Sequence, residues 1–70
     1  MMPLALANKN EEIVIKKVGG SPEVKKHLED MGFIAGTPVT LISEISGNVI
    51  VNVKNVRVAI SREMAIKIMV

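Results

Sequence analysis

Residues 39–61 read VTLISEISGNVIVNVKNVRVAIS and carry the clearest periodicity in the chain. Branched apolar residues recur at every second position, most regularly over Val49–Val53, and a period of two is typical of a strand that buries one face. Ser46–Asn48 and Asn55 interrupt this pattern with residue types that accept positive φ. We therefore predict three consecutive strands joined by two tight turns, at Val39–Glu44, Val49–Val53 and Val56–Ser61.

Outside this segment the sequence predicts two more strands and two single helical turns. Glu12–Val18 reads EIVIKKV and is followed by two glycines, which is typical of a strand and its end. Ile66–Val70 is expected to form the last strand. Pro3–Ala7 is expected to form a helical turn because Pro suits the first position of a helix. Ser61 is expected to cap a second turn over Arg62–Ala65.

One helix is predicted between the first two strands. Ser21–Glu23 reads SPE, which supplies a capping hydroxyl, a preset φ and an acid near the positive end of the helix dipole. Val24, Leu28 and Met31 then recur at i, i+4 and i+7 on one face. Gly32 suits the left-handed conformation that ends many helices. The helix is therefore expected to end at Met31.

Length and composition limit the architecture. The chain has 70 residues, of which 49% are hydrophobic, and no cysteine, so we expect a single domain over residues 1–70 without disulfides. Five short strands are too few for a β-sandwich and suit a small, strongly bent barrel. We predict a mainly β fold, namely a five-stranded SH3-like barrel with one helix between its first two strands and short helical turns near both ends.

The composition argues against several classes of function. A net charge of +2, one Phe and no Trp or Tyr leave neither the basic patch nor the stacking platforms of a nucleic-acid binder. His27 is the only histidine, and no phosphate-binding loop or G-x-S-x-G motif occurs, so we expect no enzymatic activity. The apolar opening Met1–Ala7 is too short to cross a bilayer. We expect a soluble, cytoplasmic protein without direct membrane insertion.

The most specific motif lies where the helix ends. Residues Leu28–Thr37 fit the pattern L-x-x-M-G-F-x-x-G-T. By this motif and its other matching positions, the chain resembles the FeoA family, the ferrous iron transport protein A domains, over nearly its whole length. The other matching positions are Pro3, Leu4, Val58, Ala59, Ile60, Ala65, Ile68 and Val70.

The resemblance implies an SH3-like barrel and a cytoplasmic accessory role in bacterial or archaeal ferrous iron uptake. The implied partner is the membrane transporter FeoB or its GTP-binding domain. The chain departs from the family's pattern at Lys9 and Asn10, where Pro-Gly is usual, and at Asn55, where Gly is frequent. Its hairpin at Ser46–Asn48 is also shorter than the common form, which puts in doubt any partner contact that the longer loop makes elsewhere.

The turn after the helix is a candidate contact surface for a partner protein. Phe33 and Ile34 are apolar, whereas connecting turns are usually polar. Gly32 and Gly36 are explained either as turn residues alone or as the edges of a docking loop. The predicted partner-binding residues are Leu28, Met31, Gly32, Phe33, Ile34 and Gly36.

The chain also has more apolar residues than so small a barrel can enclose. Some apolar surface should therefore remain exposed, as in proteins that bind a partner or self-associate, and a homo-oligomer is one possible outcome. We do not expect all of the following residues to be buried: Leu4, Leu6, Phe33, Ile34, Ile45 and Met64.

Glu23, His27 and Asp30 form a candidate metal site on one helix face, because an imidazole and carboxylates suit divalent first-row ions. This site supports an alternative function, a small ferrous iron-binding protein that senses or delivers the ion. We favour the interpretation that the three side chains are simply solvated, since exposed ligands on a single helix bind weakly, and we expect no cofactor. Four lysines could likewise face an anionic partner, but we favour a solvated face for them: Lys16, Lys17, Lys25 and Lys26.

Overall fold

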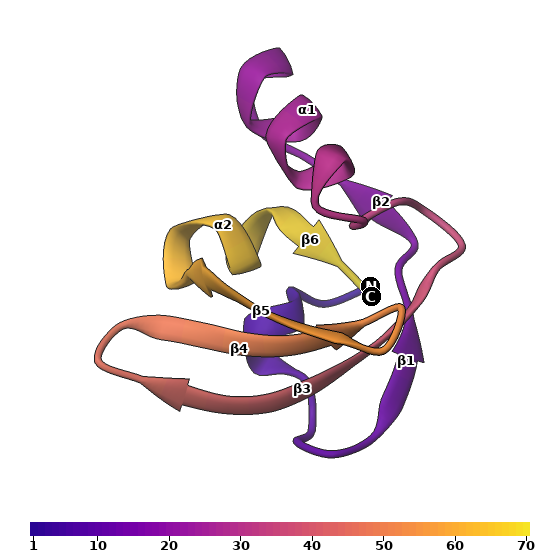
Figure 1. The fold of residues 1–70 in the computed structure, drawn as a ribbon. Coiled ribbons are helices and arrows are strands. Elements are labelled where there is room, and N and C mark those ends of the chain that lie inside the picture. Colours follow the sequence, from indigo (N-terminus) through magenta and orange to yellow (C-terminus); the bar gives the residue numbers. More distant parts are fainter.

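The computed structural model describes residues 1–70, which form a mainly β fold with short helices (Figure 1). Six strands are present where five were predicted, because the first predicted strand is divided into two. In chain order the elements are η1 (Leu4–Leu6), β1 (Glu12–Val14), β2 (Lys17–Val18), α1 (Pro22–Asp30), β3 (Pro38–Ile45), β4 (Asn48–Val53), β5 (Val56–Ser61), α2 (Arg62–Lys67) and β6 (Ile68–Met69).

The larger sheet is antiparallel, with the strand order β1-β3-β4-β5. Its three long strands confirm the three consecutive strands predicted from the period of two. Two-residue turns join them, Ser46-Gly47 with φ of 49° and 80° and Lys54-Asn55 with φ of 51° and 65°. Two successive positive φ values match the right-handed twist of the strands on either side. Asn48, predicted to lie in the first turn, is instead the first residue of β4.

The prediction of one continuous strand over Glu12–Val18 is wrong. β1 pairs with β3, whereas β2 pairs with β6 in a separate two-stranded sheet. The hydrogen bonds change partner between the two pieces, because the Ile15 N–H donates to Thr37 O and the next N–H, of Lys16, donates to Met69 O. The strands therefore make two sheets and do not close into one barrel.

The predicted last strand over Ile66–Val70 is also too long, because α2 continues to Lys67 and leaves only two residues for β6. The Ser61 hydroxyl accepts a hydrogen bond from the Met64 N–H at 3.2 Å, which confirms the predicted cap.

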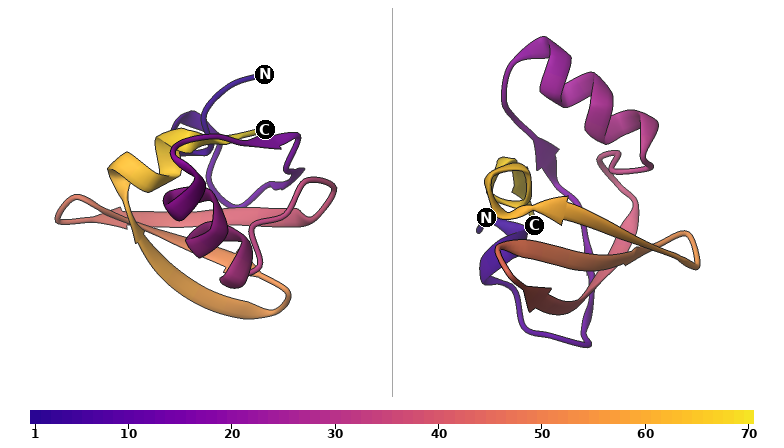
Figure 2. Two further views of the ribbon diagram at one scale, coloured as in Figure 1. Left: turned by 90° about the horizontal axis from the view of Figure 1, so that it is seen from above. Right: turned by 60° about the vertical axis from the view of Figure 1, so that its left-hand side comes forward.

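The two chain ends lie side by side (Figures 1 and 2). Met2 and Val70 exchange two backbone hydrogen bonds, of 3.0 and 2.8 Å.

Helix α1 stands apart from the sheets in Figure 1 and in the right-hand view of Figure 2. Its start is as predicted, because the Ser21 hydroxyl accepts a hydrogen bond from the Val24 N–H at 3.3 Å. Leu28 is the only buried residue of the helix. Val24 and Met31, on the same face as Leu28, are half-buried against the core, so the helix is attached to the rest of the molecule along one line of apolar side chains.

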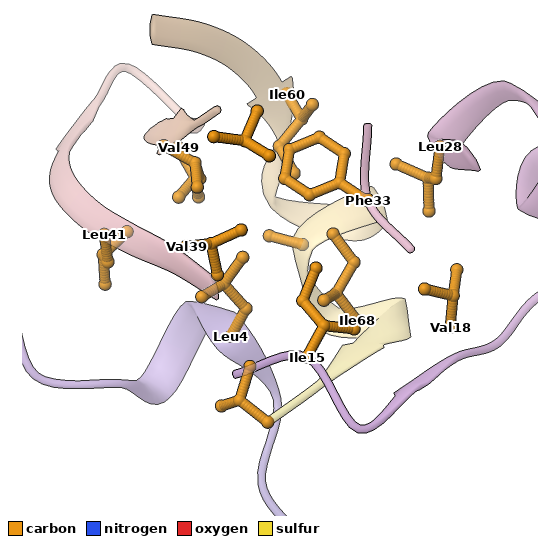
Figure 3. Packing of buried hydrophobic residues seen from close by; sticks show 14 residues of the cluster. Leu4, Ile15, Val18, Leu28, Phe33, Val39, Leu41, Val49, Ile60 and Ile68 are labelled. Carbon is orange, nitrogen blue, oxygen red and sulfur yellow. The ribbon is translucent and has the colours of Figure 1, made fainter. Parts of the chain in front are cut away.

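One cluster of 14 buried hydrophobic residues fills the space between the two sheets, η1 and α2 (Figure 3). The predicted surplus of apolar side chains is confirmed, because Leu6, Ile34 and Ile45 are exposed by 62, 45 and 59%, whereas Leu4 and Phe33 are buried. None of the helices is both long enough and apolar enough to traverse a bilayer.

Candidate functional site

A groove of about 330 Å³ lies between β2, α1 and the loop that follows α1. We call it the β2–α1 groove. It is lined by Lys16–Val18 from the β2 segment, by Lys25 and Glu29 from α1, and by Phe33–Ala35 from the loop. In Figure 1 these segments meet where β2 passes the lower end of α1. The lining of the groove thus combines basic side chains from β2 and α1 with an apolar floor, formed by Val18 and Phe33–Ala35.

The loop is held in place by the way α1 ends. Gly32, with a φ of 102°, donates its N–H to Glu29 O, and the Phe33 N–H donates to Leu28 O, both at 2.9 Å. These two bonds form a Schellman motif, in which the residue after the glycine packs on the last turn of the helix. Phe33 and Leu28 both have no exposed surface, so this contact anchors α1 to the core.

The far side of the loop is fixed to the β1–β2 connection. The Gly36 N–H donates to Ile15 O at 2.7 Å, and the Thr37 N–H donates to Ile34 O at 3.0 Å. Ile34 is thereby presented to solvent from a backbone that is hydrogen-bonded on both sides of it. A rigid, exposed apolar side chain loses little conformational freedom when a partner covers it.

The structure divides the six predicted partner-binding residues into three groups, which are buried, half-buried and exposed. Leu28 and Phe33 lie in the core and present no surface to a partner, because the Schellman motif turns both inward. Met31 and Gly32 are half-buried, and Ile34 and Gly36 are exposed. Contact with a partner therefore stays a prediction for the exposed part of the loop. The spacing of Leu28, Gly32 and Phe33 is itself the signal for this inward packing.

The β2–α1 groove is lined by three of the four lysines considered above, namely Lys16, Lys17 and Lys25. The fourth, Lys26, does not line it. All four side chains are exposed, as their interpretation as a solvated face requires. Sequence reasoning missed that three of them surround one hollow. The segments that carry them are brought together by the pairing of β2 with β6 and by the anchoring of α1.

The candidate metal ligands Glu23, His27 and Asp30 are exposed on α1, and the structure does not bring them together. No group of three His, Asp or Glu side chains is placed to hold a metal ion. Seven residues at 1.5 Å each separate Glu23 from Asp30 by about 10 Å along the helix axis. Ligand atoms around one ion lie within about 4 Å of each other, since each is about 2 Å from the metal.

Substitutions of Gly36 test how firmly the loop after α1 is held in its conformation. A Cβ added at Gly36 would meet nothing within 4 Å, but its φ is 91°. We expect Gly36→Ala to lower the free energy of unfolding by about 1–2 kcal/mol through backbone strain alone. Gly36→Asn should lose less, because Asn tolerates positive φ better. Urea denaturation followed by far-UV circular dichroism measures both, and an alanine variant as stable as the parent would mean that the loop relaxes freely.

Comparison with known proteins finds a family model and a relative that match nearly the whole chain. The model of the FeoA domain family matches residues 2–70. A Methanocaldococcus jannaschii protein named as an Fe(2+) transport protein A is 37% identical over 70 residues, which are 100% of this chain and 85% of the relative.

Solved structures share the fold at lower sequence identity. FeoA protein from Chlorobium tepidum has a TM-score of 0.87 at 20% identity, with 97% of this chain and 67% of that chain covered. Stenotrophomonas maltophilia FeoA, described as a prokaryotic SH3 domain protein complexed with zinc, has a TM-score of 0.83 at 19% identity, with 99 and 88% covered. The SH3-like fold predicted from the sequence is thereby confirmed.

Proposed function

The chain belongs to the FeoA family, and from this membership we propose that it is an accessory protein of ferrous iron uptake that acts by binding another protein. The proposed partner is the membrane transporter FeoB, through its GTP-binding domain, and the proposed location is the cytoplasm. The name of the archaeal relative, an Fe(2+) transport protein, supports the role in iron uptake. Contact rather than catalysis is the proposed mode of action.

The observation that carries a binding role is the exposed loop at the end of α1. Ile34 is 45% exposed and is held by hydrogen bonds of the neighbouring backbone to the β1–β2 connection. Ala35 and Gly36 beside it are also exposed and too small to shield it. A partner that covers Ile34 gains apolar burial at a small cost in entropy.

We expect Ile34→Asp to weaken binding to the purified GTP-binding domain of the transporter by at least about tenfold, because it places a charge in an apolar contact. Ile45→Asp is the matched control, since Ile45 is also exposed, by 59%, but lies at the end of β3 next to the β3–β4 turn. Biolayer interferometry on both variants measures the difference. Equal binding by the two variants would remove the loop from the proposed interface.

The same assay separates the proposal from the iron-binding alternative. The proposal predicts association in buffer treated with a chelator, with no change when ferrous iron is added under anaerobic conditions. Association only in the presence of ferrous iron, abolished by His27→Ala, would instead support a protein that senses or delivers the ion.

A further inference from the structure

We propose that the β2–α1 groove binds an extended peptide segment that carries both acidic and apolar side chains. The inference deepens the proposed function by naming the chemistry of the partner segment, and it rests on that function only in assuming that the loop after α1 belongs to the interface. It is drawn from three features of the groove, which are its charge, its floor and the backbone at its edge.

The charge of the groove favours an acidic ligand. Lys16, Lys17 and Lys25 line it together with one carboxylate, that of Glu29. None of these four residues forms an ion pair within the chain, because the only salt bridge joins Arg62 to Glu44. The three ammonium groups are therefore free to pair with carboxylates of a ligand, and like charges around one hollow attract an opposite charge more strongly than isolated ones.

The floor of the groove favours a ligand that also has apolar side chains. Val18, Phe33, Ile34 and Ala35 form the hydrophobic half of its lining. Val18 and Phe33 are buried, so Ile34 and Ala35 supply the apolar surface that a ligand can contact. Ile34 still has nearly half of its surface exposed, 45%, so a bound apolar side chain would remove that surface from water. A hollow with a rigid apolar floor fits a peptide better than a flat lipid surface, which lysines alone would serve.

The backbone of β2 offers a further anchor at the edge of the groove. Lys17 and Val18 pair with Met69 and Ile68 of β6, and the Gly19 N–H donates to Lys67 O at 2.8 Å. Gly19 and Lys67 thus form a hydrogen-bonded pair, and the neighbouring pair of Val18 and Ile68 is of the non-hydrogen-bonded kind, in which the backbone groups point away from the partner strand. Val18 itself lines the groove, so an extended peptide can add hydrogen bonds there in the manner of an extra strand.

The groove does not fit the proline-rich ligands that many SH3 domains bind. Those ligands dock in grooves lined by aromatic side chains. This chain has no Trp or Tyr, and its one aromatic side chain, Phe33, has no exposed surface. The SH3-like fold is therefore used here with a different binding chemistry.

A matched pair of lysines on α1 provides the test. Lys25 lines the groove and Lys26 does not, yet each has an acidic residue four positions later, Glu29 and Asp30. Charge reversal to Glu therefore costs the helix about the same at either position. We expect Lys25→Glu to weaken binding of a fluorescein-labelled peptide of alternating Glu and Leu by about tenfold, and Lys26→Glu to weaken it by less than about twofold. Fluorescence anisotropy with the full chain measures both.

Three further ligands test whether the groove requires an acidic, partly apolar peptide. A peptide of alternating Lys and Leu and a proline-rich peptide should not bind, and binding as tight as that of the acidic peptide would overturn the proposal. Failure of the acidic peptide to bind would overturn it as well. So would binding of phosphatidylserine vesicles in place of the peptide, with the same loss on Lys25→Glu, because the lysines would then serve a lipid surface.

The outcome can be separated from that of the proposed function. If the transporter domain binds and Ile34→Asp weakens it, but the acidic peptide neither binds nor competes, the proposed function stands and the groove assignment fails. If the peptide binds as expected and the transporter domain does not, the groove assignment stands and the partner must be another protein with an acidic segment.

Discussion

Phe33→Ala is expected to lower the free energy of unfolding by about 3–5 kcal/mol, the usual cost of removing a buried aromatic ring. A chain of 70 residues has a total stability of only about 4–10 kcal/mol, so the variant should lose a large part of its stability. The loss is large because Phe33 has no exposed surface and contributes to the core between the sheets and α1 (Figure 3). Urea denaturation followed by far-UV circular dichroism gives the difference, since the chain lacks Trp and Tyr fluorescence.

Ile34→Ala is the control for this prediction, because Ile34 is the next residue and is 45% exposed. Its free energy of unfolding should change by no more than about 0.5 kcal/mol, as is usual for surface positions. The pair separates packing in the core from partner contact, the role that the sequence analysis predicted for both residues. A stable, folded Phe33→Ala variant that only loses partner binding would contradict the position of Phe33 in the core.

The loss of Phe33 should also disturb the β2–α1 groove. Helix α1 has one buried residue, Leu28, and it is joined to Phe33 by the Schellman motif. Without the ring, the last turn of α1 loses its main anchor, and Lys25 and Glu29 are no longer fixed at their positions in the groove lining. Fold and candidate site therefore depend on the same contact.

The three long strands of the larger sheet were predictable from sequence because the residues that indicate them are close together in the chain. The period of two over Val49–Val53 decides which face is buried, and the two turns need residues that accept positive φ within a few positions. Such signals do not depend on distant parts of the chain. The extra residue at the Leu41–Ser43 register shift had no such local signal.

The division of Glu12–Val18 was not predictable, because EIVIKKV contains no Gly, Pro or Asn that would indicate a break. Which half pairs with β3 and which with β6 is decided by partners more than twenty and about fifty positions away. The candidate groove was missed for the same reason, since its three walls come from separate segments. At the C-terminal end, the strand was predicted to begin at Ile66 because branched side chains favour strands. The helix-forming residues of REMAIK and the Ser61 cap outweigh this preference, and α2 therefore includes Ile66.

Leu4 and Leu6 carry the second large prediction, because the same substitution at these two positions should give very different results. Both lie in η1, yet Leu4 has no exposed surface and Leu6 is 62% exposed. We expect Leu4→Ala to lower the free energy of unfolding by about 3 kcal/mol or more, from lost transfer free energy and the cavity left behind. Leu6→Ala should change it by no more than about 0.5 kcal/mol.

The loss at Leu4 should be close to the full cost of a buried cavity because its segment cannot move easily to fill the space. The backbone bonds between Met2 and Val70 fix the N-terminal segment next to β6, and η1 packs against α2. Urea denaturation of both variants measures the difference between them. Similar, small losses would mean that the N-terminal turn is not part of the cooperative core, and the pairing of the two chain ends would then be too weak to hold Leu4 in place.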